Sequence, residues 1–127
     1  MHIQMKQFSW PQGNYMIMVA QGILSVRSLE QILIKVAAAA LARPNCKVLI
    51  DLIDATCTIA PTEISRLFSE LRPDLYPTRS RIALVSQLDD DHHASLYNVS
   101  TCLAQHGFHI AVFRESKAAV NWLADLF

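Results

Sequence analysis

Two carboxylates stand at the end of an unbroken apolar segment near the middle of the chain. Asp51 lies within the run Lys47–Ile53, and Asp54 follows it directly. Two aspartates at the carboxyl end of a strand could begin a metal-dependent phosphoryl-transfer site, which would also need a late lysine such as Lys117. Aspartates at strand ends also hydrogen-bond loop amides and begin turns. We favour this structural role for the pair.

Three threonines surround the loop that follows this segment. Thr56 and Thr58 lie in the loop, and Thr62 follows Pro61, where a helix is expected to begin. Each hydroxyl could cap that helix. It could instead carry a regulatory phosphate, which would meet exposed backbone N–H groups but also the unfavourable charge of Glu63. Capping is the simpler interpretation. We take five residues as candidate binding residues, and none as catalytic or metal-ligating: Asp51, Asp54, Thr56, Thr58 and Thr62.

A second acidic cluster precedes another predicted helix. Asp89, Asp90 and Asp91 are followed by His92 and His93, a set of side chains that could ligate a metal. Adjacent helical residues point about 100° apart, so the two histidines do not easily share one ion, although Asp89 could pair with either. Negative charge in a first helical turn also offsets the helix dipole. Without a third fixed ligand, we interpret the cluster as a solvated helix start.

Several classes of site are excluded by the sequence. It contains no G-x-S-x-G turn for a nucleophile and no glycine-rich phosphate loop, and it has only three glycines. The cysteines Cys46, Cys57 and Cys102 are odd in number and form no C-x-x-C pair, which argues against a disulfide framework or a zinc site. We expect reduced thiols and no cofactor.

Composition describes an ordinary globular protein. The 127 residues are 52% hydrophobic, and eleven basic side chains balance eleven acidic ones, so neither a disordered chain nor a nucleic-acid surface is indicated. The longest apolar stretch, Val36–Ala42, is far shorter than the roughly 20 residues of a spanning helix. We therefore expect a single domain over residues 1–127, without a membrane span and located in the cytoplasm.

The order of the elements predicts an α/β fold. Segments 2–8 and 15–20 read as an antiparallel hairpin, 46–53 as a central strand, and 81–86 and 108–113 as further strands. Helices are predicted from Ser28 to Leu41, from Pro61, from Asp89 to Gly107 and from Ser116. Because strands and helices alternate after residue 46, the five-stranded sheet should be mixed but mostly parallel, with helices on its faces.

The helices carry one-sided apolar patterns. Ser28 with Gln31 predicts a capping box at the first helix, and Ile34 lies off the apolar stripe. Ile64 and Phe68 should anchor the second helix to the sheet. The inward residues of the first helix are predicted to be Leu29, Ile32, Leu33, Val36, Ala37, Ala40 and Leu41, and those of the last helix Val120, Leu123 and Phe127.

The order and spacing of these segments resemble the STAS family, named for sulfate transporters and anti-sigma-factor antagonists, and especially its stand-alone SpoIIAA-like branch. The resemblance spans roughly residues 15–127. It rests on Val19–Leu24, Val48–Leu52 with Pro61–Ile64, Arg81–Val85, and Val112–Arg114 with Ala118–Leu123. It implies a non-enzymatic module that binds a protein, a nucleotide or an apolar ligand, often near the loop after the central strand.

The resemblance also implies a position for a regulatory motif. Antagonists of that family are switched by phosphorylation of a serine in an Asp-Ser-Ser-Gly-like turn at the head of the following helix. The corresponding turn here is Thr58–Glu63, and it contains no serine. This difference argues against the phosphorylation switch.

We therefore expect a regulatory or binding module that recognises a protein partner or small ligand near the loop Asp54–Thr62. An alternative is a carrier of an apolar, lipid-like ligand, because four methionines, five phenylalanines and many alanines could line a cavity. A third is a small enzyme that uses Asp51 and Asp54. A homodimer is also plausible, with Ile34 and the exposed face of the first strand as the contact.

Overall fold

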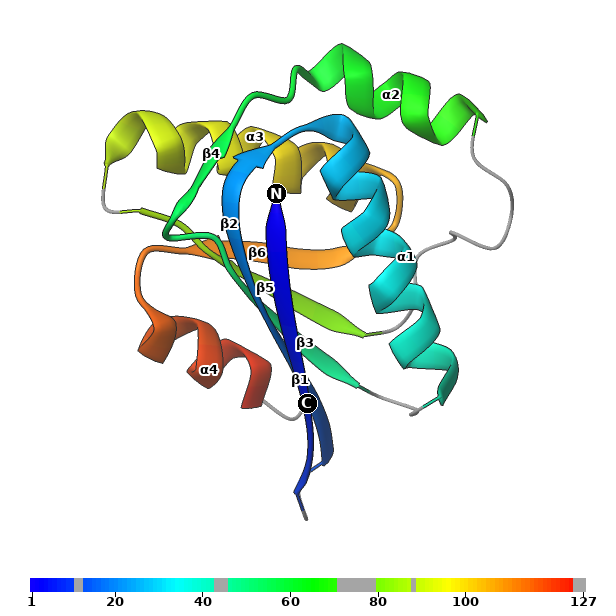
Figure 1. Cartoon of the computed structure of the whole chain (residues 1–127), viewed down its shortest axis with the longest axis vertical. Coiled ribbons are helices and arrows are strands. Elements are labelled where there is room, and N and C mark those ends of the chain that lie inside the picture. Colours follow the sequence, from blue (N-terminus) through cyan, green and yellow to red (C-terminus); the bar gives the residue numbers. More distant parts are fainter. Residues whose placement is uncertain (11–12, 43–45, 71–79, 88, 125–127) are drawn as a thin grey trace.

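A computed structural model of the chain describes residues 1–10, 13–42, 46–70, 80–87 and 89–124. Figure 1 shows how its strands and helices follow one another. The strands are β1 (His2–Trp10), β2 (Gly13–Leu24), β3 (Lys47–Asp51), β4 (Ala55–Cys57), β5 (Arg81–Val85) and β6 (His109–Phe113). The helices are α1 (Val26–Ala42), α2 (Pro61–Glu70), α3 (Asp90–Gln105) and α4 (Ser116–Ala124).

The sheet has the order β1-β2-β3-β5-β6, with β3 in the middle. The β1–β2 hairpin is antiparallel and the other pairs are parallel. The predicted mixed α/β fold, its hairpin and its central strand are therefore confirmed. One strand was not predicted, because β4 lies within the loop expected over 54–60 and is too short to give a periodic signal. It pairs with the far end of β2.

Gly22 marks the place where β2 changes its partner. Residues Tyr15–Val19 pair with β3, whereas Gly22–Leu24 pair with β4. The backbone of Gly22 has φ +109°, a conformation that residues with a Cβ rarely adopt. β2 is therefore longer than the strand predicted over 15–20, and its last residues form part of a second, smaller ribbon.

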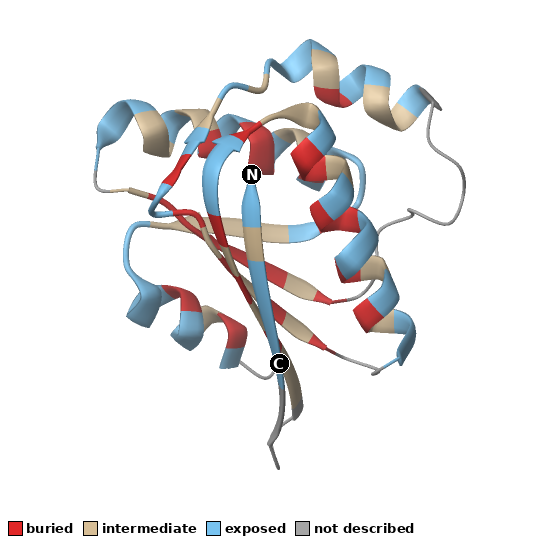
Figure 2. Cartoon of the chain, viewed as in Figure 1, coloured by how far each residue is buried: buried red, intermediate tan, exposed pale blue. Residues whose placement is uncertain are grey.

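Helices cover both faces of the sheet (Figure 1). The larger apolar cluster joins alternate residues of β2, β3 and β5, such as Met18, Ile50 and Ile82, to α1 and α3. A smaller cluster on the opposite face joins Ala83 and Val85 of β5 to α4. Figure 2 displays the resulting stripes of buried residues along the strands and the inner faces of the helices. The central strand is thus covered by helices above and below.

The predicted start of α1 is wrong by one turn. The helix begins at Val26, and the Ser25 hydroxyl accepts a hydrogen bond from the Ser28 backbone N–H at 3.3 Å, so Ser25 occupies the cap that we assigned to Ser28. At the other end Leu41 is 88% exposed, and Ala39 takes a core position instead. Twelve residues at about 100° each turn Leu41 roughly 120° away from Leu29, off the buried stripe.

Two other inward assignments also need correction. Val120 is exposed because Ala119 and Leu123, four residues apart, form the buried stripe of α4. Helix α2 packs mainly on α1 and α3 rather than directly on the sheet. Its Ile64 is fully buried as expected. The predicted helix ends near Pro44 and Pro73, and the predicted core residue Phe127, lie outside the described residues.

Among the described residues, no helix has both the length and the apolar character needed to cross a bilayer.

Candidate functional site

The loop after β3 is fixed by a turn that Asp51 organises. The Asp51 carboxylate accepts a hydrogen bond from the Ile53 backbone N–H at 3.0 Å, and the Ala55 N–H donates to the Leu52 carbonyl at 3.1 Å. The structural role predicted for Asp51 is confirmed. Asp54 is exposed at the tip of this turn, and its backbone carbonyl accepts a hydrogen bond from the Gly22 N–H at 3.2 Å.

The rest of the loop is held against the end of β2. Thr56 pairs in register with Ile23, and its side chain is exposed. The Thr58 backbone N–H donates to the Leu24 carbonyl at 3.1 Å, and its hydroxyl lies 3.5 Å from the same oxygen. Thr58 therefore extends the ladder between the loop and β2. It does not cap the helix that follows.

Glu63, and not a threonine, caps α2. Its carboxylate accepts a hydrogen bond from the Ala60 backbone N–H at 2.9 Å, while its own N–H donates to the Ala60 carbonyl at 3.0 Å. This is the glutamate half of a capping box. Thr62 is exposed in the same helical turn. The predicted capping role of the threonines is therefore wrong, and a carboxylate occupies the position where a phosphate would meet the helix start.

Two exposed isoleucines lie beside the candidate residues, and the sequence analysis missed them. Ile23 is 60% exposed and Ile53 is 42% exposed. Ile23 and Thr56 are partners in a parallel ladder, so their side chains project from the same side of the ribbon. We call Ile23, Ile53, Asp54 and Thr56 the β2–β4 surface. Gly22, which interrupts the apolar pattern of β2, was the available signal that the strand bends here.

A groove borders the same loop between α1 and α2. Its volume is about 220 Å³. The lining combines two arginines, two glutamates and two apolar residues: Val26, Arg27, Glu30, Glu63, Arg66 and Leu67. The formal charges of this lining are balanced. Its lining residues come from the first turns of α1, which follows β2, and from α2, which follows the loop.

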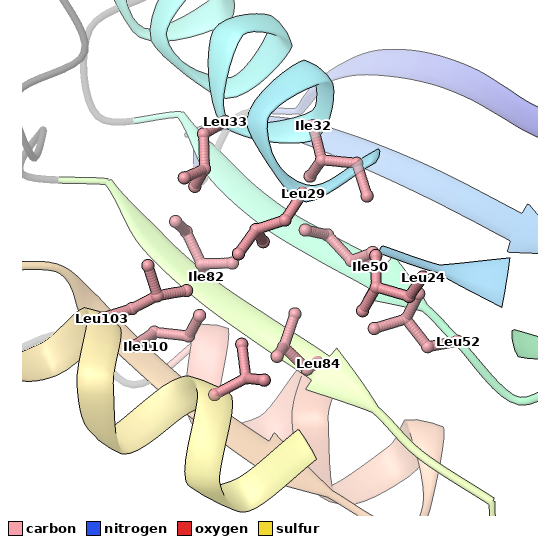
Figure 3. Close-up of a pocket in the computed structure, with 11 residues that line it drawn as sticks. Leu24, Leu29, Ile32, Leu33, Ile50, Leu52, Ile82, Leu84, Leu103 and Ile110 are labelled. Carbon is pink, nitrogen blue, oxygen red and sulfur yellow. The ribbon is translucent and has the colours of Figure 1, made fainter. Parts of the chain in front are cut away.

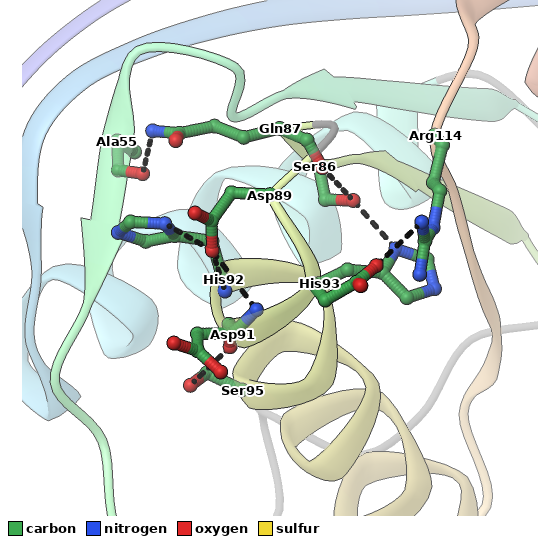
Figure 4. A network of polar contacts seen from close by, with 10 residues as sticks. Ala55, Ser86, Gln87, Asp89, Asp91, His92, His93, Ser95 and Arg114 are labelled. Atoms are coloured by element: carbon green, nitrogen blue, oxygen red, sulfur yellow. Dashed lines mark hydrogen bonds and ion pairs between the residues drawn. The ribbon is translucent and has the colours of Figure 1, made fainter.

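Polar contacts connect this edge of the sheet to the start of α3 (Figure 4). The Gln87 side-chain amide donates to the Ala55 carbonyl of β4 at 3.2 Å. The Ser86 hydroxyl lies 2.7 Å from His93 Nδ1. Such a pair can activate a serine, but here Ser86 is buried and its hydroxyl also lies 3.2 Å from the Gln87 carbonyl. The pair positions α3 against β5.

The acidic cluster forms the start of α3, as predicted. The Asp89 carboxylate accepts hydrogen bonds from the Asp91 and His92 backbone N–H groups at 2.9 and 3.1 Å. Asp90 forms an ion pair with Arg114 at 2.8 Å. No set of three histidine, cysteine, aspartate or glutamate side chains within the described ranges is placed to hold a metal ion. The sequence could not reveal the distant partners Ala55 and Arg114.

We predict that Asp89 makes stability depend on pH. The hydrogen bond from the His92 backbone N–H is the main cause that lowers the pKa of Asp89. A carboxylate of lowered pKa stabilises the fold above its ordinary pKa, and this contribution is lost as the pH falls through the lowered value.

Asp89→Asn keeps the capping oxygen but does not titrate. We expect its urea midpoint to fall less than that of the wild type between about pH 5 and pH 2. Parallel profiles for the two proteins would contradict the assignment.

A small cavity in the apolar core lies between the sheet and the helices α1 and α3 (Figure 3). Its volume is about 20 Å³, which is room for roughly one water molecule. Its lining is entirely aliphatic: Leu24, Leu29, Ile32, Leu33, Ile50, Leu52, Ile82, Leu84, Val99, Leu103 and Ile110. Ligand pockets usually enclose about 300–1,000 Å³, so this cavity does not support the alternative of a lipid carrier.

Comparison with known proteins supports the predicted fold. The sequence matches no protein-family model and no curated protein. An uncharacterized protein of the DUF3478 family from Shewanella loihica PV-4, described as having a SpoIIAA-like fold, is similar with a TM-score of 0.56 and 17% sequence identity, over 95% of this chain and 93% of that one. The unphosphorylated anti-sigma factor antagonist SpoIIAA gives a TM-score of 0.48 and 11% identity, over 97% and 100%. The similarity to the first of these proteins, whose fold is described as SpoIIAA-like, confirms the predicted fold.

Proposed function

We propose that the chain is a non-enzymatic regulatory module that binds a protein partner through the β2–β4 surface. The observation that carries the proposal is the pair of exposed isoleucines, Ile23 and Ile53, on a backbone held by β2. Large apolar side chains exposed next to polar ones are typical of protein contact sites. Asp54 and Thr56 supply the polar groups, and the neighbouring groove adds Arg27 and Arg66.

The chemistry of the site favours binding over catalysis. Asp51 already accepts a hydrogen bond within its own turn, and Asp54 and Thr56 are exposed to solvent. The Ser86 hydroxyl lies beside a possible general base, because it is hydrogen-bonded to His93, but it is buried. A catalytic group needs access to substrate and a partner that activates it. The exposed candidate residues have access but no activating partner among the residues described, whereas Ser86 of the Ser86–His93 pair is buried. Exposed apolar and polar side chains side by side fit a contact surface better.

We further propose that the chain works as one domain in the cytoplasm. The cysteines Cys46, Cys57 and Cys102 are free, which fits a reducing compartment. Burial raises the pKa of Cys57, and this favours the inert protonated thiol.

The proposal predicts that contact with a partner is confined to the β2–β4 surface. A photo-crosslinking side chain at Thr56 should form a specific adduct in the cell of origin, whereas the same group at the exposed Lys117 of α4 should not. Ile23→Asp should reduce the Thr56 adduct at least about tenfold, because a charge replaces an apolar contact. The matched control is Val120→Asp, which alters another exposed aliphatic residue, on α4.

Equal adducts from both positions, or an adduct at Thr56 that survives Ile23→Asp unchanged, would contradict the proposed surface. Circular dichroism melting of each variant checks that both remain folded.

A further inference from the structure

The strand β1 forms one edge of the sheet. It pairs with β2 in nine consecutive registers, from His2 with Gln21 to Trp10 with Gly13. In the part of the chain that the structure describes, no strand lies along its other side. The opposite edge of the sheet, β6, is only five residues long and packs against α3 and α4. β1 is therefore the longer and less covered of the two edges.

β1 has few of the features that usually protect an edge strand. The segment His2–Trp10 contains no proline, and its register with β2 runs without a bulge. Lys6 is its only Lys, Arg, Asp or Glu residue. Edges that are long, regular and weakly charged are ready to pair with another strand through their free N–H and C=O groups. Met5, in the middle of the strand, is 43% exposed.

We propose that β1 pairs antiparallel with β1 of a second copy of this chain, so that two sheets join across a two-fold axis at Met5. A two-fold axis perpendicular to the sheet brings identical edges together with their hydrogen-bonding groups in complementary order. Residues that face each other across two paired strands project from the same face of the sheet. Such an axis must therefore lie between the two copies of one residue, which face each other.

The charge of Lys6 selects among the central registers. An axis at Lys6 would give the longest overlap but would place two ammonium groups directly opposite each other, which is unfavourable. An axis at Gln7 would leave Ile3 without an opposite residue within β1. With the axis at Met5, Lys6 faces Gln4 of the second copy, Ile3 faces Gln7, and the exposed Met5 is covered by its own copy. This register removes the charge conflict and buries apolar surface.

The register can be tested by disulfide trapping. Residues that face each other in antiparallel strands have Cα atoms about 4.5–5.5 Å apart, within disulfide range. Met5→Cys should therefore form a covalent dimer under mild oxidation. Gln7→Cys is the matched control. In this register the two Gln7 positions are offset by four residues along the strands, about 13 Å, so their thiols should not crosslink. Wild-type protein reports any background from Cys57 and Cys102.

The association itself is tested by mass measurement in solution. Sedimentation equilibrium should find twice the monomer mass of 14.3 kDa. Met5→Lys, which places two cations on the axis, should raise the dissociation constant about a hundredfold, while Gln7→Lys, which faces Ile3, should change it little. Monomer at all concentrations would overturn the dimer, and crosslinking through Gln7→Cys instead of Met5→Cys would overturn the register. Neither outcome bears on the β2–β4 surface.

Discussion

Ile64→Ala is expected to lower the free energy of unfolding by about 2–5 kcal/mol, because it removes a fully buried side chain and leaves a cavity beneath α2. Among the α2 side chains that the structure describes, Ile64 is the only buried one, while Leu67 and Phe68 are half-buried. The helix otherwise depends on contacts such as the stacking of Phe68 on His106, at 4.3 Å between ring centroids. Urea unfolding followed by circular dichroism gives the change in free energy.

A matched control for this variant is Ile53→Ala. It makes the same chemical change at a partly exposed position. It should lower the free energy of unfolding much less than Ile64→Ala does, by on the order of 1 kcal/mol or less. Hydrogen exchange should accelerate first in α2 of Ile64→Ala. Equal stability of the two variants would contradict the packing of α2 on the core through Ile64.

Gly22→Ala is expected to destabilise the fold by about 1–3 kcal/mol, because a residue with a Cβ does not tolerate φ +109° without strain. The Cβ itself would lie 3.5 Å from the Met1 Cα, an ordinary contact, so the cost arises from the backbone and not from crowding. The same change should also weaken the proposed binding at the β2–β4 surface, because a shift of the backbone at residue 22 would misalign the N–H that donates to the Asp54 carbonyl. Thermal or urea unfolding measures the first effect.

The control for Gly22 is its neighbour Gln21→Ala. Gln21 is exposed on the same strand, and its replacement should change the stability by less than about 0.5 kcal/mol. Equal effects at the two positions would show that the conformation of Gly22 carries no special cost.

The sequence was most informative where a pattern is long and local. The segment around Val48 and Ile50 was recognisable as a central strand because it is apolar throughout, and the hairpin and helices followed from periodicity and turn residues. The strand β4 escaped notice because three residues carry no period. Leu41 was misplaced because a small error in helical phase grows over three turns.

The site was less predictable, since its contacts join distant parts of the chain. The turn at Asp51 depends on a neighbour two residues away and could be expected. The capping by Glu63 was hidden because the threonines offered equally good local candidates. The bond from Gln87 to Ala55 spans 32 residues and has no local signature. The exposure of Ile23 likewise depends on where β2 leaves the main sheet.

The strand β4 has a thermodynamic consequence for recognition. Main-chain hydrogen bonds from Gly22 and Thr58, together with the Gln87 side chain, order this segment before any partner arrives. A segment that is already ordered loses little conformational entropy on association, so more of the free energy gained by covering Ile23 and Ile53 is retained as affinity. Docking onto it can proceed without a folding step, which favours rapid, rigid-body encounter.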